Sequence, residues 1–349
     1  MTEKSFFGRT KDGRQVCLYK LTNSKGASVT LSDYGARIVS LCVPDRNGVL
    51  DDVTLGYADI ASYEQNNGYF GAVVGRCANR LRNASFQLNG RRYALPANNM
   101  GVNTLHGGFN GFDKKVWDAQ SSEMSVRFSC FSADGEEGFP GNLQVSVEYR
   151  FTDENELQLS YEAKSDQDTL VNLTNHAYFN LDGHKGEKAS RQILTIDADF
   201  YTPVNQYLQL TGEVLSVAGT VFDFRRPHRI DLFIDDAHPQ LRIAGGYDHT
   251  FVMRKSERGA FERAAELYSP ASGRYMEVYT TQPGMQFYSG NNITCREGKN
   301  GAVYEKRQGI CLETHSFPDA MANPHFPSPI LRAGESFRQV TSYKFGVRE

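Results

Sequence analysis

Short stretches of alternating apolar and polar residues recur along the chain, and this pattern constrains its fold more than any other feature. Clear examples are Val145–Phe151, Leu157–Tyr161 and Ser125–Phe131, each bounded by Gly, Asp or Asn turn residues. A period of two places alternate side chains on opposite faces of a strand, so these segments predict half-buried antiparallel strands. Similar short runs occupy residues 27–31, 39–43, 170–173, 193–197, 274–280 and 310–313.

Helical periodicity is weak by comparison. The two candidate helices, residues 58–65 and 260–267, are too short to form a layer of their own. No alternation of strands with helices is present, and many short strands separated by turns are typical of a sandwich or barrel. The sequence therefore predicts an all-β, antiparallel fold with few short helices.

The charge balance excludes several classes of partner. Lys and Arg number 38 and Asp and Glu number 41, which leaves no net positive field for nucleic acid or an anionic membrane surface. No apolar run is long enough for a signal peptide or a membrane span. The six cysteines are scattered without a C-x-x-C pair, so we expect them to be reduced and the protein to be cytoplasmic.

Four polar stretches place His, Asn, Arg or Glu among Gly and aromatic residues, where a core strand would use Val, Ile or Leu. The stretches are Gly75–Arg80, Asn103–Gly108, Asn172–Asn180 and Gly309–His315. Taken singly, the first can be a turn with a solvated Arg, and the second a hairpin turn with a buried His. Its paired glycines would also let the backbone approach a ligand closely.

The third stretch is more informative, because strand periodicity puts a row of polar side chains on one face. That row is Asn172, Thr174, His176, Tyr178 and Asn180. An ordinary solvent-facing strand would explain it, although such faces normally carry Lys and Glu.

The fourth stretch is an apolar strand that includes Glu313. Buried Cys and Leu neighbours would raise the pKa of this carboxyl by desolvation, which would suit a general base. The alternative is a strand that reaches the surface at this residue.

Two further polar insertions, residues 246–251 and 282–290, supply Asp248 and Gln286. Neutral hydrogen-bonding groups flanked by aromatics fit an unphosphorylated sugar, and Tyr178, Tyr247 and Tyr288 are candidates for sugar contact as well as for core packing. A metal is disfavoured, because the eight histidines form neither H-x-H nor H-E-x-x-H, and a ligand set would have to come from distant segments.

Five of these motifs together closely resemble the aldose 1-epimerase family in order and spacing. They are Gly75–Arg80, Asn103–Gly108, Thr174–Leu181, Tyr247–Phe251 and Leu312–Ala320, within a similarity that extends from Asp33 to Phe345. The resemblance implies a β-supersandwich, no cofactor or metal, and interconversion of the α and β anomers of free hexoses such as galactose and glucose.

The same resemblance implies roles for individual residues. Glu313 stands at the position of the general base and His176 at that of the general acid, while His106 helps to hold the ring oxygen. The other positions that line the sugar site are Asn79, Arg80, Tyr178, Asp248 and Gln286. Two residues depart from the common pattern: His315 stands where many members carry Gln, and Cys77 where an aromatic or aliphatic residue is frequent.

Ring opening needs a group that takes the proton of the C1 hydroxyl and a group that protonates the ring oxygen. A bell-shaped pH profile is expected, with one limb for each of these groups. A hexose-6-phosphate epimerase would need additional cations, and a non-catalytic sugar-binding protein would not need the intact acid and base. A glycosidase would need a second carboxylate, for which Asp248 is the only candidate in the motifs.

A length of 349 residues would ordinarily suggest two domains. The candidate site residues, however, begin at Asn79 and end at Glu313, and they must meet around one small ligand. We therefore expect a single domain over residues 1–349, present as a monomer or weak homodimer, with a free aldose as its partner.

Overall fold

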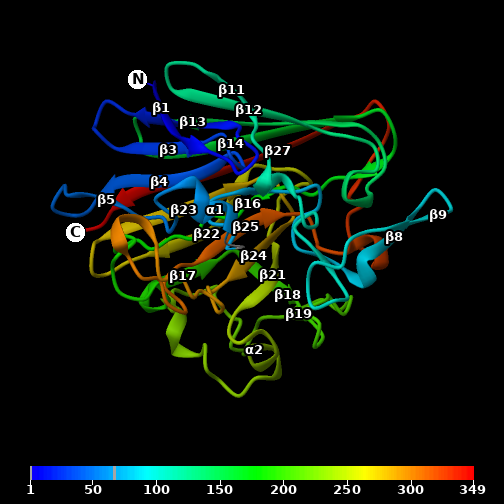
Figure 1. Cartoon of the computed structure of the whole chain (residues 1–349). Helices are drawn as coiled ribbons and strands as arrows, with labels where there is room; N and C mark the ends of the chain where they lie inside the picture. The colour runs from blue at the N-terminus through cyan, green and yellow to red at the C-terminus, as the bar shows by residue number, and fades with distance from the viewer. Residues whose placement is uncertain (1, 66–67) are drawn as a thin grey trace.

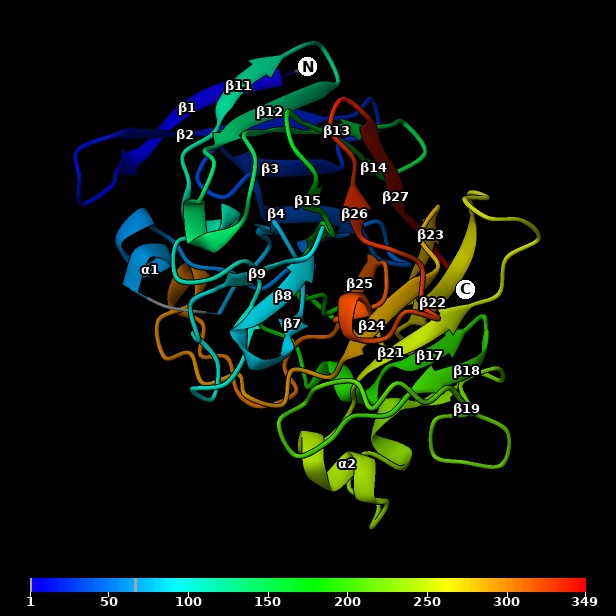
Figure 2. The same ribbon diagram turned by 90° about the vertical axis from the view of Figure 1, so that its right-hand side faces the viewer.

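The computed structural model describes residues 2–65 and 68–349, and antiparallel sheets dominate it (Figures 1 and 2). The largest sheet has nine strands, and its strand order is β11-β12-β13-β14-β27-β23-β22-β17-β20. In that order the strands are Asp118–Ser121, Ser125–Ser132, Leu143–Phe151, Glu156–Ser165, Ser336–Val347, Arg274–Thr280, Glu262–Tyr268, Ile193–Ile196 and His228–Arg229. The all-β prediction is confirmed.

Two five-stranded sheets lie against this large sheet. The first contains β1 (Thr2–Arg9), β2 (Gln15–Thr22), β3 (Ser28–Ser32), β4 (Arg37–Pro44) and β5 (Leu50–Asp52) in sequence order. The second has the order β19 (Leu215–Ser216), β18 (Ala198–Thr202), β21 (Asp248–Met253), β24 (Gly284–Tyr288) and β25 (Cys311–His315).

The described chain also contains short strand pairs and short helices. The pairs are β6 (Val73–Val74) with β16 (Thr174–Asn175), β7 (Arg80–Leu81) with β10 (Thr104–Leu105), β8 (Ser85–Leu88) with β9 (Arg91–Ala94), and β15 (Thr169–Leu170) with β26 (Ile330–Leu331). The two α-helices among the described residues are α1 (Ile60–Gln65) and α2 (Pro239–Ala244). In the part of the chain that the structure describes, no helix is long and apolar enough to cross a membrane.

One hydrophobic cluster connects the three large sheets. It includes Leu31 of β3, Leu159 of β14 and Phe287 of β24, all with no exposed surface. Strand alternation produces this arrangement, because every second residue of β14 points inward. Each fully buried side chain of this size contributes roughly 1.5–3 kcal/mol, so the shared core holds the sheets together.

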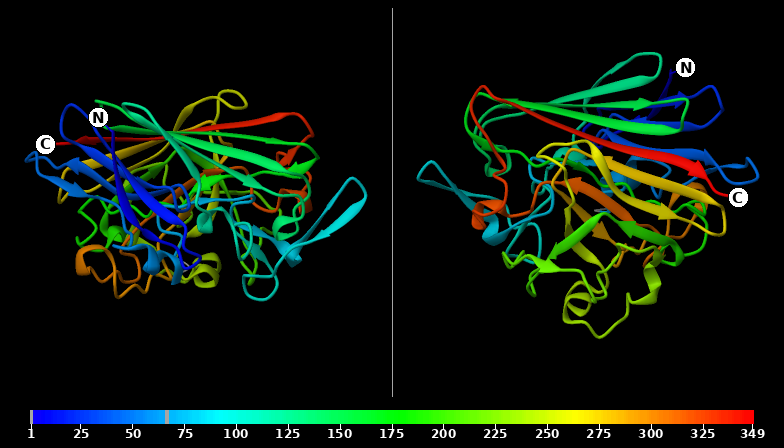
Figure 3. Two further views of the ribbon diagram at one scale, coloured as in Figure 1. Left: turned by 45° about the horizontal axis from the view of Figure 1, so that its top comes forward. Right: turned by 180° about the vertical axis from the view of Figure 1, so that it is seen from behind.

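The C-terminal strand β27 runs through the middle of the nine-stranded sheet (red in Figure 3). It pairs with β14 on one side and with β23 on the other. Strand β27 therefore connects β14, from the first half of the sequence, with β23, from the second half.

The helix expected at residues 260–267 is wrong. Residues Glu262–Tyr268 form strand β22, which pairs with β17 and β23. The Ala, Glu and Leu of this segment favour a helix locally, but pairing on both sides and burial of Ala264, Ala265 and Leu267 outweigh that preference.

The other sequence-based elements differ mainly at their ends. The helix expected at 58–65 begins at Ile60, and the strand expected at 170–173 is reduced to Thr169–Leu170. Helix α2 has no apolar periodicity to reveal it, although Pro239 stands at its start and His238 caps it.

Candidate active site

Segments far apart in the sequence meet around a cavity of about 360 Å³. Seven of the eight predicted site residues line it: Asn79, Arg80, His106, His176, Tyr178, Asp248 and Glu313. The exception is Gln286, which lies behind Asp248 and does not line the cavity.

The second five-stranded sheet supplies the carboxylates of the site. Glu313 on β25 lies opposite Gln286 on β24, which in turn lies opposite Thr250 on β21. These three side chains share one face of the sheet, while the intervening Leu312 and Phe287 belong to the hydrophobic core. Strand alternation thus gives this sheet a polar face on the site and an apolar face in the core.

Gln286 holds the carboxylate of Asp248 in place. Its amide nitrogen donates to Asp248 Oδ1 at 2.6 Å, and its amide oxygen accepts from the Thr250 hydroxyl at 2.5 Å. Arg80 lies on the other side of this carboxylate, with 3.6 Å between its Nη2 and Asp248 Oδ2. Arg80 Nε in turn donates to Asn99 Oδ1 at 3.2 Å. The carboxylate is therefore oriented from two sides.

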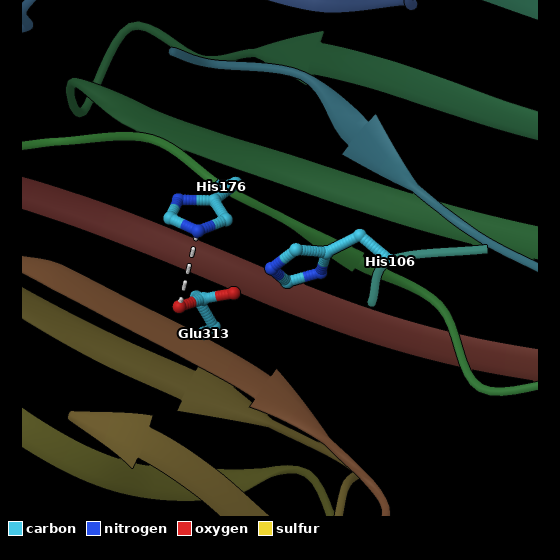
Figure 4. A group of neighbouring side chains, drawn as sticks. All are labelled: His106, His176 and Glu313. Carbon is cyan, nitrogen blue, oxygen red and sulfur yellow. Dashed lines mark ion pairs between the residues drawn. The ribbon is translucent and has the colours of Figure 1, made fainter. Parts of the chain in front are cut away.

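His106, His176 and Glu313 form the centre of the site, and both imidazole rings point toward the carboxylate (Figure 4). His176 Nε2 lies 3.7 Å from Glu313 Oε1, and both side chains are almost fully buried. The two histidine rings are 5.1 Å apart between centroids. The separation between Nε2 and Oε1 exceeds a hydrogen bond, so each group can hydrogen-bond to a ligand atom that lies beside the pair.

Backbone pairing positions His106 opposite Asn79. The β7–β10 pair brings the two residues together, and His106 N donates to Asn79 O at 3.0 Å while Asn79 N donates to His106 Nδ1 at 3.2 Å. The glycine that follows His106 serves this packing: a Cβ at Gly107, which has a φ of +89°, would overlap the carbonyl of Gly75. The sequence led us to expect that this glycine lets the backbone approach a ligand closely. In the structure the close approach is to the backbone of Gly75.

Desolvation sets the charges of the central groups. Burial raises the pKa of Glu313 well above its ordinary value, the nearby Asp248 carboxylate adds to this shift, and the Arg80 guanidinium opposes it. Burial also lowers the pKa of His176 to about 3 and moves that of His106 well below its ordinary value. These surroundings therefore favour a neutral His176–Glu313 pair that holds one carboxyl proton.

The same three side chains could in principle hold a cation. Their ligand atoms lie within 4.8 Å of one another, and they come from distant segments, as a metal site in this sequence would require. However, His106 Nδ1 accepts the Asn79 N–H, so the hydrogen of the neutral ring is on Nε2, the nitrogen that would have to offer a lone pair. The arrangement suits a hydroxyl or ring oxygen better than a metal ion.

Aromatic rings surround His176. Tyr178 and Tyr69 lie nearly parallel to the imidazole, at 4.9 Å and 5.7 Å between centroids, and both line the cavity. Tyr288 also lines it, whereas Tyr247 is fully buried and packs on Phe287. Of the two roles expected for Tyr247, sugar contact and core packing, the structure supports core packing.

Tyr69 and Asn99 line the cavity but were not identified from the sequence. Each lies outside the polar motifs, in a segment whose composition is that of an ordinary loop. Only the tertiary contacts of Tyr69 with both histidine rings, and of Asn99 with Arg80, reveal them.

The polar row at residues 172–180 is buried throughout, so the solvent-facing interpretation is wrong. Only His176 and Tyr178 reach the cavity. The side chains of Asn172 and Asn180 donate to backbone carbonyls, and only Thr174–Asn175 of this stretch is a strand. The row is an irregular buried segment that serves both structure and site.

The two departures from the family pattern lie outside the cavity lining. His315 is fully buried on the same face of β25 as Glu313, and its Nδ1 donates to Ser316 O at 2.6 Å. Cys77 belongs to a separate small apolar cluster.

Known proteins resemble this chain over nearly its whole length. Residues 17–344 match a family model described as aldose 1-epimerase. The chain is 44% identical to a galactose mutarotase of Mus musculus over 345 residues, which cover 99% of this chain and 98% of that protein. It is 38% identical to an aldose 1-epimerase of Escherichia coli K12 over 339 residues, 96% of each chain.

Solved structures give the same result. A crystal structure described as an aldose epimerase homologue from C. elegans superposes with a TM-score of 0.88 at 29% identity, covering 99% of this chain and 100% of that chain. A galactose 1-epimerase from Lactobacillus acidophilus superposes with a TM-score of 0.85 at 29% identity, covering 100% and 99%.

Proposed function

The chain belongs to the aldose 1-epimerase family and is an isomerase, and from this premise we propose that it interconverts the α and β anomers of free hexoses with Glu313 as general base and His176 as general acid. The observation that carries this proposal is the buried pair at 3.7 Å, which faces a cavity lined by hydrogen-bonding side chains. His106, Asn79, Arg80, Tyr178 and Asp248 surround the same space.

In the proposed reaction, the working form of the pair is Glu313 carboxylate with His176 imidazolium. It contains the same number of protons as the neutral pair and differs from it only in the position of one proton. The carboxylate takes the proton of the C1 hydroxyl while His176 Nε2–H protonates the ring oxygen, which opens the ring to the aldehyde. After rotation about C1–C2, the reverse transfers close the ring on the other face.

Side chains held in fixed positions around the cavity would recognise the oxygens of the sugar. The Nε2 hydrogen of His106 can donate to the ring oxygen, and the oriented Asp248 carboxylate and Arg80 guanidinium can bind vicinal hydroxyls in bidentate fashion. Specificity must come from these remote hydroxyls, since C1 changes configuration in each turnover.

A neutral sugar fits the charges better than a sugar phosphate. Among the described residues that line the cavity, Arg80 is the single Arg or Lys, and it already faces Asp248 at 3.6 Å. A phosphate would need a cation that is not already paired in this way. The buried acid–base pair in turn favours catalysis over simple sugar binding.

We also propose that residues 1–349 act as one domain in the cytoplasm. Support for the first point is the cavity, which draws on residues from Tyr57 to Glu313, and the central position of β27. The six free cysteines are compatible with a reducing compartment.

The test follows the optical rotation of freshly dissolved α-galactose, α-glucose and a hexose 6-phosphate. We expect catalysis with the free sugars, weak or no catalysis with the phosphate, and a loss of about 10²–10⁴ in rate for His176→Asn. Near-full activity of that variant would show that His176 is not the acid. Stoichiometric sugar binding without rate enhancement by the unmodified protein would show a binding protein.

A further inference from the structure

The two pocket histidines have different partners at Nδ1. In His106, Nδ1 lies 3.2 Å from the backbone N–H of Asn79, which can only donate. In His176, Nδ1 lies 3.5 Å from the sulfur of Cys311. The partner of one ring nitrogen decides which nitrogen of a neutral imidazole carries the hydrogen, so this difference bears directly on what each ring presents to the sugar.

We propose that Cys311 is a positioning residue whose sulfur accepts the Nδ1 hydrogen of His176, so that the two histidines face the sugar in opposite tautomers: His106 with hydrogen on Nε2, and His176 with hydrogen on Nδ1. This inference rests on the proposed role of His176 as the acid. It assigns to Cys311 a part in that role which does not require contact with the substrate, because Cys311 does not line the cavity.

The proton transfers of the proposed reaction require that Nδ1 of His176 donates and the sulfur of Cys311 accepts. Nε2 faces Glu313 Oε1, so Nε2 must gain the proton that makes the imidazolium and lose it to the ring oxygen. The hydrogen that remains on the ring after each transfer is therefore on Nδ1. An acceptor beside Nδ1 stabilises the ring at every stage, whereas a donor there would place the hydrogen on Nε2 and block transfer from Glu313.

The chemistry of Cys311 suits this part. Burial raises the pKa of its thiol well above the ordinary value, so the sulfur remains uncharged, and the Tyr178 side chain hydrogen-bonds to it. A neutral acceptor orients the ring but does not hold it permanently in the imidazolium form. A buried carboxylate at the same position would do so. The backbone carbonyl of His176 assists, since a hydrogen bond to it opposes the lowering of the His176 pKa by burial.

Strand geometry explains how the sulfur reaches the ring. Cys311 and Glu313 are two residues apart on β25, so both side chains point to the same face. One strand therefore presents a carboxylate near Nε2 of His176 and a sulfur near Nδ1. The ring is held between two residues of the same strand.

The direct test is the ¹⁵N NMR spectrum of the imidazole rings in the sugar-free protein at neutral pH, with His106→Gln and His176→Asn used to assign the signals. We expect His106 to be protonated at Nε2 and His176 at Nδ1. A His176 ring with its hydrogen on Nε2 would overturn the proposal whatever the activity is. Loss of activity in His176→Asn tests the proposed function separately, so the two failures can be told apart.

Substitutions of the thiol supply the second test. Cys311→Ala removes the acceptor, and we expect kcat to fall about five- to tenfold with KM nearly unchanged, together with a mixture of His176 tautomers. Cys311→Ser retains an acceptor and should restore both the Nδ1 tautomer and most of kcat. Cys17→Ala, at a buried cysteine outside the cavity lining, is the matched control and should leave kcat unchanged. A folded Cys311→Ala protein with the tautomers and kcat of the unmodified protein would overturn the proposal.

Discussion

Two polar faces of this molecule arise from the same alternating pattern but lie in opposite environments. The outer face of the nine-stranded sheet carries Arg127 and Glu162, which form an ion pair at 2.8 Å with side chains 41% and 45% exposed. The site face of the β21-β24-β25 sheet carries Thr250, Gln286 and Glu313, of which none is more than 3% exposed.

The environment decides what such a polar row can do. Water and salt screen the outer pair, so it contributes about 0–1 kcal/mol, and many changes there are tolerated. On the site face desolvation shifts the pKa of Glu313 upward, and each hydrogen bond fixes a neighbour. A polar strand face that is buried can therefore tune and orient reactive groups, and an exposed one cannot.

The largest effect should come from matched Glu→Gln changes on the two faces. Glu313→Gln removes the base while keeping a neutral side chain of the same shape, so the mutarotation rate should fall by about 10²–10⁴. Folding should be retained, because the carboxyl is already favoured in its neutral form. The measurements are polarimetry and thermal unfolding.

Glu162→Gln is the control for that comparison. It should leave the rate unchanged and alter the free energy of unfolding by less than about 0.5 kcal/mol. Equal activity losses in the two variants would contradict the distinction between the faces.

A smaller effect is expected when the hydrogen bonds behind the site are removed. Gln286→Leu takes the amide donor from Asp248 and the acceptor from Thr250, so the carboxylate is no longer held. Loss of a hydrogen bond to a charged group should raise KM by about tenfold or more, with a smaller change in kcat. Gln144→Leu, at an exposed position of β13, provides the same substitution on the outer face and should change neither constant. An unchanged KM in Gln286→Leu would exclude the orienting role.

The smallest effect is expected from pH. A pair with ordinary pKa values would change protonation near pH 4.3 and 6.5. Here the pKa of His176 is lowered to about 3 and that of Glu313 is raised, so the pair holds one shared proton across the interval between them. The bell-shaped pH profile of kcat expected from the sequence should therefore broaden, with its acidic limb below about pH 4.3 because the pKa of His176 is lowered, and its basic limb moved upward because the pKa of Glu313 is raised. Steep limbs at the ordinary values would show that bound sugar restores ordinary pKa values.

The sequence determined the fold class and most of the polar residues around the cavity. Alternation is a local property, so strands such as Arg274–Thr280 could be located from their own residues. Motif order and spacing pointed to Glu313 and His176, because the resemblance to the aldose 1-epimerase family lies in those short segments.

Only the tertiary structure decided which polar groups are buried and what each one touches. Residues 262–268 are a strand because neighbouring strands pair with both edges, and Gln286 orients Asp248 because β24 lies between β21 and β25. The tautomer partners Asn79 and Cys311 lie 27 and 135 residues from the histidines they contact. Desolvation and hydrogen-bond direction depend on all the atoms around a group, and strand pairing brings those atoms from segments that are distant in the sequence.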